Sequence, residues 1–114
     1  MIYDRFTVVR VPFPFTDRNA VKNRPALVLS DAAAFSATSG HSVMAMITSQ
    51  GHAPWPLDCS IRELDAAGLP APSVVRFKRF TLDHRLIRST LGQLAEVDRA
   101  AVLGALQRLL RVVP

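Results

Sequence analysis

The chain is built of short apolar runs of strand length, separated by stretches that contain proline or glycine. Apolar and β-branched residues favour strands, whereas proline cannot donate to a strand ladder and glycine favours turns. Pro12, for example, is expected to end the first strand. The predicted strands are residues 6–11, 25–30, 42–48, 57–60, 73–80 and 86–94, the last being a short strand or a turn. Several strands this short favour a small, strongly curved sheet or barrel.

In the C-terminal residues of the sequence, the apolar side chains recur with helical spacing. Residues 96–112 carry apolar side chains close to helical spacing, and the acidic Glu96 and Asp98 favour the start of a helix. These apolar residues are Val97, Ala101, Leu103, Leu106, Leu109 and Leu110. A helical turn is expected in 31–40, a short helix or turn in 61–68, and loops in 13–24 and 51–56. At 114 residues, we expect one domain over 1–114, mainly β with a C-terminal helix.

The chain is basic, with a net charge of +5 and twelve arginines among its fourteen cations. Guanidinium groups bind phosphate well, so this charge fits a polyanionic partner, although a GC-rich genome also produces an arginine-rich surface. Cys59 is the only cysteine, which excludes an internal disulfide and a cysteine-based zinc cluster and favours a reducing, cytoplasmic setting. No run of about eighteen apolar residues occurs, so we expect no membrane partner.

Five segments in order resemble the PemK/MazF toxin family. They are VPFPFTD at 11–17, NRPALVLS at 23–30, ITS at 47–49, GLPAPSVVRFKRFTL at 68–82 and LGQLAEVD at 91–98. The resemblance implies a small SH3-like barrel with a C-terminal helix, a homodimer and a cognate antitoxin protein. It also implies a ribosome-independent endoribonuclease that cuts single-stranded RNA by attack of the RNA 2′-hydroxyl, leaving a 2′,3′-cyclic phosphate and a 5′-hydroxyl.

The resemblance also assigns the catalytic residues. Arg24 matches the active-site arginine of the family, and Thr48 matches its hydroxyl residue, with Ser49 beside it. RNA carries its own nucleophile, so the protein has to stabilise charge on the phosphate and move protons; we therefore expect neither a metal nor another cofactor. Arg24 can place a planar charge against the phosphoryl oxygens, but neither hydroxyl is basic enough to act alone as the general base.

A second group of residues is expected to bind RNA. The group consists of Lys22, Asn23, His52, Trp55, Arg76 and Lys78. Trp55 can stack on an unpaired base or fill a gap under its own loop, and the two readings stay open. His52 can shuttle a proton or be a solvated loop residue. Arg76, Lys78 and Arg79 can follow phosphates or simply protect an edge strand by their charge.

The chain departs from the family pattern in a few places. Phe6 and Thr7 stand where family members often have Gly-Asp, and Arg10 replaces an apolar residue. Ala95 stands where a Ser or Thr N-cap is expected for the last helix. Two other functions remain open: a toxin of the same fold that poisons a protein such as DNA gyrase, as the related CcdB toxins do, and an inactive RNA-binding barrel.

Overall fold

The computed structural model describes residues 3–13, 22–51 and 53–111. It contains six strands, which are β1 (Thr7–Phe13), β2 (Lys22–Val28), β3 (His41–Ser49), β4 (Cys59–Ser60), β5 (Ser73–Asp83) and β6 (Ser89–Gln93). The helical segments are η1 (Ala32–Ser36), α1 (Ala37–Ser39), α2 (Leu64–Ala67), η2 (His84–Leu86) and α3 (Glu96–Leu109). The predicted mainly-β fold with a C-terminal helix is confirmed.

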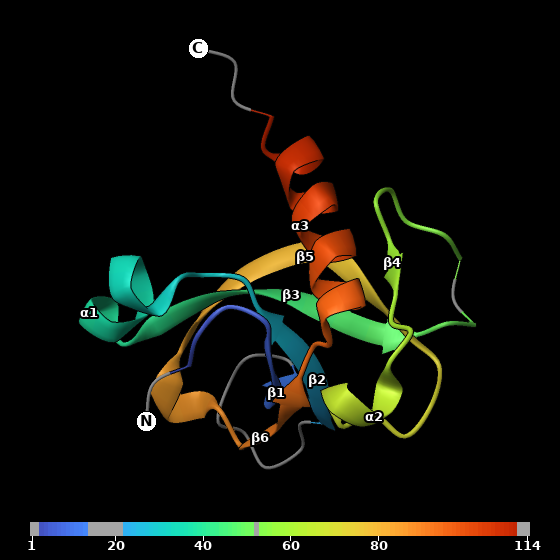
Figure 1. Cartoon of the computed structure of the whole chain (residues 1–114). Helices are drawn as coiled ribbons and strands as arrows, with labels where there is room; N and C mark the ends of the chain where they lie inside the picture. The colour runs from blue at the N-terminus through green and yellow to red at the C-terminus, as the bar shows by residue number, and fades with distance from the viewer. Residues whose placement is uncertain (1–2, 14–21, 52, 112–114) are drawn as a thin grey trace.

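The strands form one antiparallel sheet in the order β4-β5-β3-β2-β1-β6. The sheet curls into a half-barrel, so that β3 and β5 cross above β1 and β6, and α3 stands against it (Figure 1). Among the described residues, no helix is long and apolar enough to cross a membrane.

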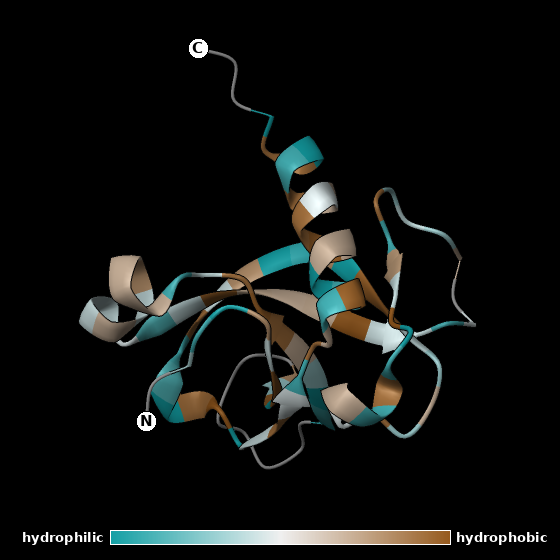
Figure 2. Cartoon of the chain, in the orientation of Figure 1, coloured by the Kyte–Doolittle hydropathy of each residue, from teal (hydrophilic) through white to brown (hydrophobic). Residues whose placement is uncertain are grey.

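Both faces of the sheet are buried, because successive side chains of each strand point to opposite sides. Val8 belongs to a first core with Leu27, Ala45 and Val75, and this core extends to α2 and α3. The neighbouring residue Val9 belongs to a second core, whose other buried members are Val11, Ala26, Val28, Met44 and Leu82. Figure 2 shows this concentration of apolar residues on the crossing strands.

Two glycines let α2 approach β6 closely. A Cβ atom on Gly92 would lie 2.3 Å from the carbonyl oxygen of Ala66, and one on Gly68 would meet the carbonyl oxygen of Leu91. Gly68 also ends α2 with a φ of +72°, a conformation that glycine adopts without strain. The predicted glycine-ended turn in 61–68 is therefore confirmed, and it covers the β6 side of the half-barrel.

Helix α3 packs against the first core with only part of the predicted apolar set, namely Leu106 and Leu109. Its buried residues are Asp98, Val102 and Ala105, whereas Val97 and Leu103 are exposed. Asp98 is buried because its carboxylate accepts the backbone N–H groups of Arg62 and Glu63, at 2.8 and 3.0 Å. Ala95 occupies the N-cap without a side-chain cap, as its place in the sequence predicts.

The strand limits correct several predictions. β1 does not end at Pro12 but continues to Phe13, because beyond Arg10 it pairs only with β2, and a proline is tolerated where a strand has one neighbour. β2 begins at Lys22 rather than at residue 25, since its first residues pair with that extension of β1. The predicted loop 13–24 is thus strand at both ends, and its residues 14–21 lie outside the described part of the chain.

β5 is longer than predicted and contains a bulge. Its register with β3 shifts from Ala45 opposite Arg79 to Met46 opposite Arg76, which leaves Phe77 and Lys78 as two extra residues. A bulge of this kind bends a strand and redirects its side chains, and bulges are common beside functional sites. Here the bulge falls within the basic stretch of β5.

Candidate active site

Arg24 and Thr48 come from neighbouring strands and lie on one face of the sheet. Ala26 of β2 pairs with Met46 of β3 at the end of the paired region, and Arg24 and Thr48 each lie two residues beyond this pair. A step of two residues keeps a side chain on the same face, so both residues share the face of the second core. The pairing of β2 with β3 therefore brings together two residues that are far apart in the sequence.

The Arg24 side chain contacts an aromatic ring and has a buried nitrogen atom that makes no hydrogen bond within the described part of the chain. It is partly buried, and its guanidinium carbon lies 5.4 Å from the centre of the Phe13 ring, within cation–π distance. Its Nε atom is buried and has no hydrogen-bond partner. No carboxylate of the described residues forms a salt bridge with it. Buried polar atoms normally have partners, so this guanidinium is available to an anionic ligand.

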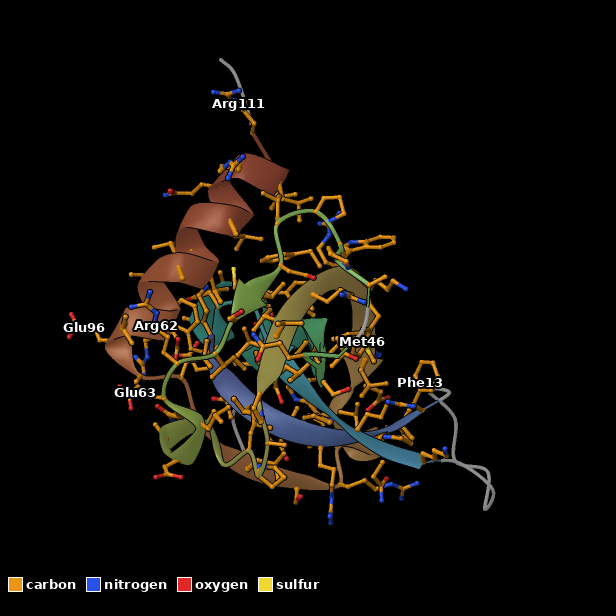
Figure 3. All side chains as sticks on the ribbon, turned by 90° about the vertical axis from the view of Figure 1, so that its right-hand side faces the viewer. Phe13, Met46, Arg62, Glu63, Glu96 and Arg111 are labelled. Carbon is orange, nitrogen blue, oxygen red and sulfur yellow. The ribbon has the colours of Figure 1, made fainter. Side chains whose placement is uncertain are left out.

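Arg24 and Thr48 form a wall shared by two hollows. The first hollow, of about 450 Å³, is lined by Phe13, Arg24, Met46, Ile47, Thr48, Arg76, Lys78, Arg79 and Phe80. The second, of about 410 Å³, is lined by Lys22, Asn23, Arg24, Pro25, Ile47, Thr48, Ser49, Leu69, Pro70, Ala71 and Ser73. Figure 3 shows Phe13 and Met46 of the first hollow on the same side of the molecule.

The cations of β5 differ in how they are held. Arg76 donates to both carboxylate oxygens of Asp58, at 3.2 and 2.9 Å, and to the carbonyl oxygen of Ala53 at 2.7 Å. Its hydrogen bonds hold the pKa of Asp58 below the ordinary value. Lys78 is exposed, and its ammonium group lies 4.6 Å from the centre of the Trp55 ring. Arg79 is exposed at the edge of the same hollow.

The sequence matches a known family over this whole region. The family model described as "PemK-like, MazF-like toxin of type II toxin-antitoxin system" matches residues 4–110. The chain belongs to this family. The resemblance seen in the sequence is thereby confirmed, and so is its expectation of a MazF-like fold.

Solved structures support the assignment. The MazE–MazF complex (Form-III) of Deinococcus radiodurans is 25% identical, with a TM-score of 0.77 over 99% of this chain and 100% of that chain. MazF (Form-I) of Deinococcus radiodurans is 26% identical, with a TM-score of 0.73 over 98% and 99%. An endoribonuclease in complex with its cognate antitoxin, from Mycobacterial species, has the same fold at 17% identity, with a TM-score of 0.73 over 99% and 97%. No curated protein sequence matches the chain significantly.

Most of the residues expected at the site of this MazF-like toxin gather around the two hollows. Arg24 and Thr48 line both, while Lys22, Asn23 and Ser49 line the second and Arg76 and Lys78 the first. Trp55 lines neither and meets the first hollow only through Lys78. His52 lies outside the described residues. The structure adds three residues that the sequence does not indicate. Met46 and Phe80 line the first hollow because of the register of their strands, and Asp58 reaches Arg76 because the loop before β4 turns.

The other histidines lie away from the site. His41 begins β3, at the opposite end from Thr48, and pairs across the sheet with Asp83. His84 contacts the buried Ser42, with 2.7 Å between Nε2 and Oγ. Neither histidine lines either hollow. Within 3–13, 22–51 and 53–111, no three His, Cys, Asp or Glu residues are arranged to hold a metal ion.

Proposed function

We propose that this protein is the toxin of a toxin–antitoxin pair and a ribosome-independent endoribonuclease that cleaves single-stranded RNA without a metal. One observation carries the proposal: Arg24, which forms no salt bridge with a carboxylate of the described residues, lines the same two hollows as the hydroxyl residue Thr48. An RNA strand that crosses this wall has a phosphate at Arg24 and a nucleotide on each side. Family membership supports the same reading.

In the proposed reaction, the RNA 2′-hydroxyl attacks the adjacent phosphorus. The 2′-hydroxyl gives up its proton as the new bond closes the 2′,3′-cyclic phosphate, the bond to the 5′-oxygen breaks, and that oxygen takes up a proton and leaves as a hydroxyl. Negative charge grows on the phosphoryl oxygens during the attack. Arg24 acts on this charge with a fixed donor, and loss of one such donor typically lowers the rate about 100- to 1,000-fold.

Thr48 contributes by orientation. Thr48 lines the same two hollows as Arg24, so in the proposed complex its hydroxyl can donate a hydrogen bond to the phosphate that Arg24 holds. Ser49 is exposed and lines only the second hollow, where it can contact the neighbouring nucleotide. We assign neither hydroxyl the role of general base, because an unassisted hydroxyl is too weak a base.

The polar side chains of the two hollows fit an RNA backbone. Lys22 and Asn23 lie on one side of Arg24, and Lys78 and the remaining donor of Arg76 lie on the other. Contacts of this kind position a nucleic acid and make its binding sensitive to salt. RNA affinity is therefore expected to fall steeply as the salt concentration rises.

We further propose that the toxin acts as a homodimer, with RNA bound at or near the dimer interface, and that an acidic, amphipathic segment of the antitoxin occupies the basic hollows. Phe13 supports this arrangement, since it is 40% exposed at the rim of the first hollow. Light scattering tests the dimer: a stable monomer that still cleaves RNA would contradict it.

The test of the function is to incubate the antitoxin-free protein with a long single-stranded RNA in EDTA, map the cuts and identify the new ends. Discrete cuts with cyclic-phosphate and 5′-hydroxyl ends are expected, and Arg24→Ala should abolish them while retaining part of the RNA affinity. Arg10→Ala is the matched control, because Arg10 is an exposed cation of the adjacent strand that lines neither hollow.

Intact RNA after incubation with a folded protein would refute the proposal. It would favour a toxin that acts on a protein target or a barrel that only binds RNA. An equal loss of binding and cleavage in Arg24→Ala would reduce Arg24 to a phosphate anchor.

A further inference from the structure

The segment 53–58, which leads from β3 toward β4, is folded tightly around Asp58. The Asp58 carboxylate accepts the backbone N–H of Trp55 at 3.0 Å, and the Asp58 N–H donates to the Trp55 carbonyl at 3.1 Å. Pro54 and Pro56 flank Trp55 and fix its backbone neighbours, since the proline ring locks φ. The tip of this segment therefore holds Trp55 in one place.

A bidentate salt bridge links the segment to the sheet. Arg76 of β5 grips both oxygens of Asp58 and also donates to the Ala53 carbonyl, so a single side chain fixes both ends of the segment. The side chains of Arg76 and Asp58 are only 11% and 20% exposed. Paired hydrogen bonds between a guanidinium and a carboxylate are strong and directional. Arg76 therefore supports the segment structurally, and its positive charge is balanced by the Asp58 carboxylate.

The segment held by Arg76 places Trp55 next to Lys78. The Lys78 ammonium lies over the Trp55 ring at 4.6 Å, and Trp55 remains 43% exposed. Lys78 also lines the hollow that contains Arg24. A partly exposed aromatic ring and a cation that lines this hollow thus stand together. A nucleotide combines the matching groups, because its base stacks on aromatic rings and its phosphate attracts an ammonium.

We propose that Trp55 and Lys78 form a platform for one unpaired nucleotide of the RNA, next to the nucleotides at the cleavage site, and that Asp58 is the positioning residue that holds this platform in place. The proposal rests on the proposed RNA cleavage and adds a subsite to it. Trp55 stacks on the base, Lys78 contacts the phosphate, and Asp58 touches neither.

The first experiment measures binding, independently of cleavage. Trp55 is the single tryptophan of the chain, so its fluorescence reports on the platform directly. The probe is a pool of short single-stranded RNAs of random sequence with 2′-O-methyl groups, which block attack, so it requires no mapped cleavage site. We expect the RNA to quench Trp55, and Trp55→Ala to weaken binding about 5- to 150-fold, the usual range for one stacked base.

The second experiment tests the role of Asp58. Asp58→Asn should raise KM several-fold at unchanged kcat, and should make Trp55 more accessible to acrylamide in the free protein, because the platform loosens while the Arg24–Thr48 wall stays intact. The matched control is Asp83→Asn. Asp83 also accepts an arginine through both oxygens, at 3.2 and 2.7 Å, and a backbone N–H, but it lies at the other end of β5.

The outcomes separate this inference from the proposed function. Unquenched Trp55 fluorescence, or an unchanged KM in Trp55→Ala, would overturn the platform while cleavage at Arg24 stands. Quenching by the blocked RNA without cleavage of natural RNA would keep the platform and refute the nuclease. Equal effects of Asp58→Asn and Asp83→Asn would refute the positioning role. If Trp55→Ala weakens only the binding of an acidic antitoxin peptide, the surface serves a protein partner and the proposal fails.

Discussion

The carboxylate of Asp98 should be among the most important single groups for the stability of this fold. It is 2% exposed, near the start of α3, and it joins that helix to the segment before α2 through the N–H groups of Arg62 and Glu63. Replacing Asp98 with alanine removes both hydrogen bonds and leaves two donors without their acceptor. Figure 3 shows Arg62 and Glu63 close to the first turn of α3.

The expected loss follows from these two contacts. A hydrogen bond to a charged group contributes about 1.5 to 3 kcal/mol. The two residues that donate are exposed, so water can reach their backbone in the variant, and we take the lower end of the range for each bond. Asp98→Ala should therefore lower the free energy of unfolding by about 3 kcal/mol. Asp98→Asn keeps one oxygen as acceptor and should fall in between.

The assay is urea unfolding followed by far-UV circular dichroism. Glu96→Gln is the matched control, because Glu96 is an exposed acid in the same turn of α3 and acts only on the helix dipole. Its removal should cost about 0.3 to 1 kcal/mol. If Asp98→Ala and Glu96→Gln destabilise the protein equally, the carboxylate does not clamp the two segments and the reasoning is refuted.

Three further predictions concern stability and reactivity. Gly92→Ala should destabilise the fold by about 1 to 3 kcal/mol in thermal unfolding because its Cβ would strike Ala66, whereas Gly104→Ala, with nothing within 4 Å, should stabilise α3 by about 0.5 to 1 kcal/mol. Burial, with His41 as a lesser cause, lowers the pKa of His84 below 6.5. The unfolded chain therefore binds the proton first, so stability should be complete above about pH 6.5 and fall below it, and His84→Gln should flatten this fall; an unchanged slope would contradict the assignment. Burial raises the pKa of the Cys59 thiol, so iodoacetamide should modify it more slowly than a free thiol at pH 8, and equal rates would show that it is accessible.

The sequence predicts the order of strands and helices well because each strand is a short apolar run between breakers. It fails where pairing outweighs local preference. Lys22 and Asn23 are polar and resemble a loop, yet they extend β2 because β1 continues past Pro12 to pair with them. The packed face of α3 is predicted only in part, through Leu106 and Leu109. Asp98 is missed because a buried acid is unfavourable unless hydrogen-bonded, and its partners, 35 and 36 residues away, are not visible in the local pattern.

For the site, the sequence indicates the proposed catalytic residues but not their neighbours. Arg24 and Thr48 are indicated by the motifs that surround them, and in the structure both line the same two hollows. No sequence motif indicates Asp58, because its importance depends on its contact with Arg76 across a turn. Arg76 itself looks like a free cation in the sequence, whereas in the structure its charge is matched by that carboxylate.

The bulge in β5 has two extra residues, Phe77 and Lys78, and the even number matters. A single extra residue would exchange the faces of the strand beyond it and turn its buried side chains to solvent. Two extra residues restore the alternation, so Val75 stays in the first core and Leu82 in the second. Of the two extra residues, Phe77 is buried in the first core, whereas Lys78 is exposed and lines the hollow that contains Arg24. In the proposed complex with RNA, adjacent residues of one bulge therefore serve the packing of the core and the contact with the nucleic acid.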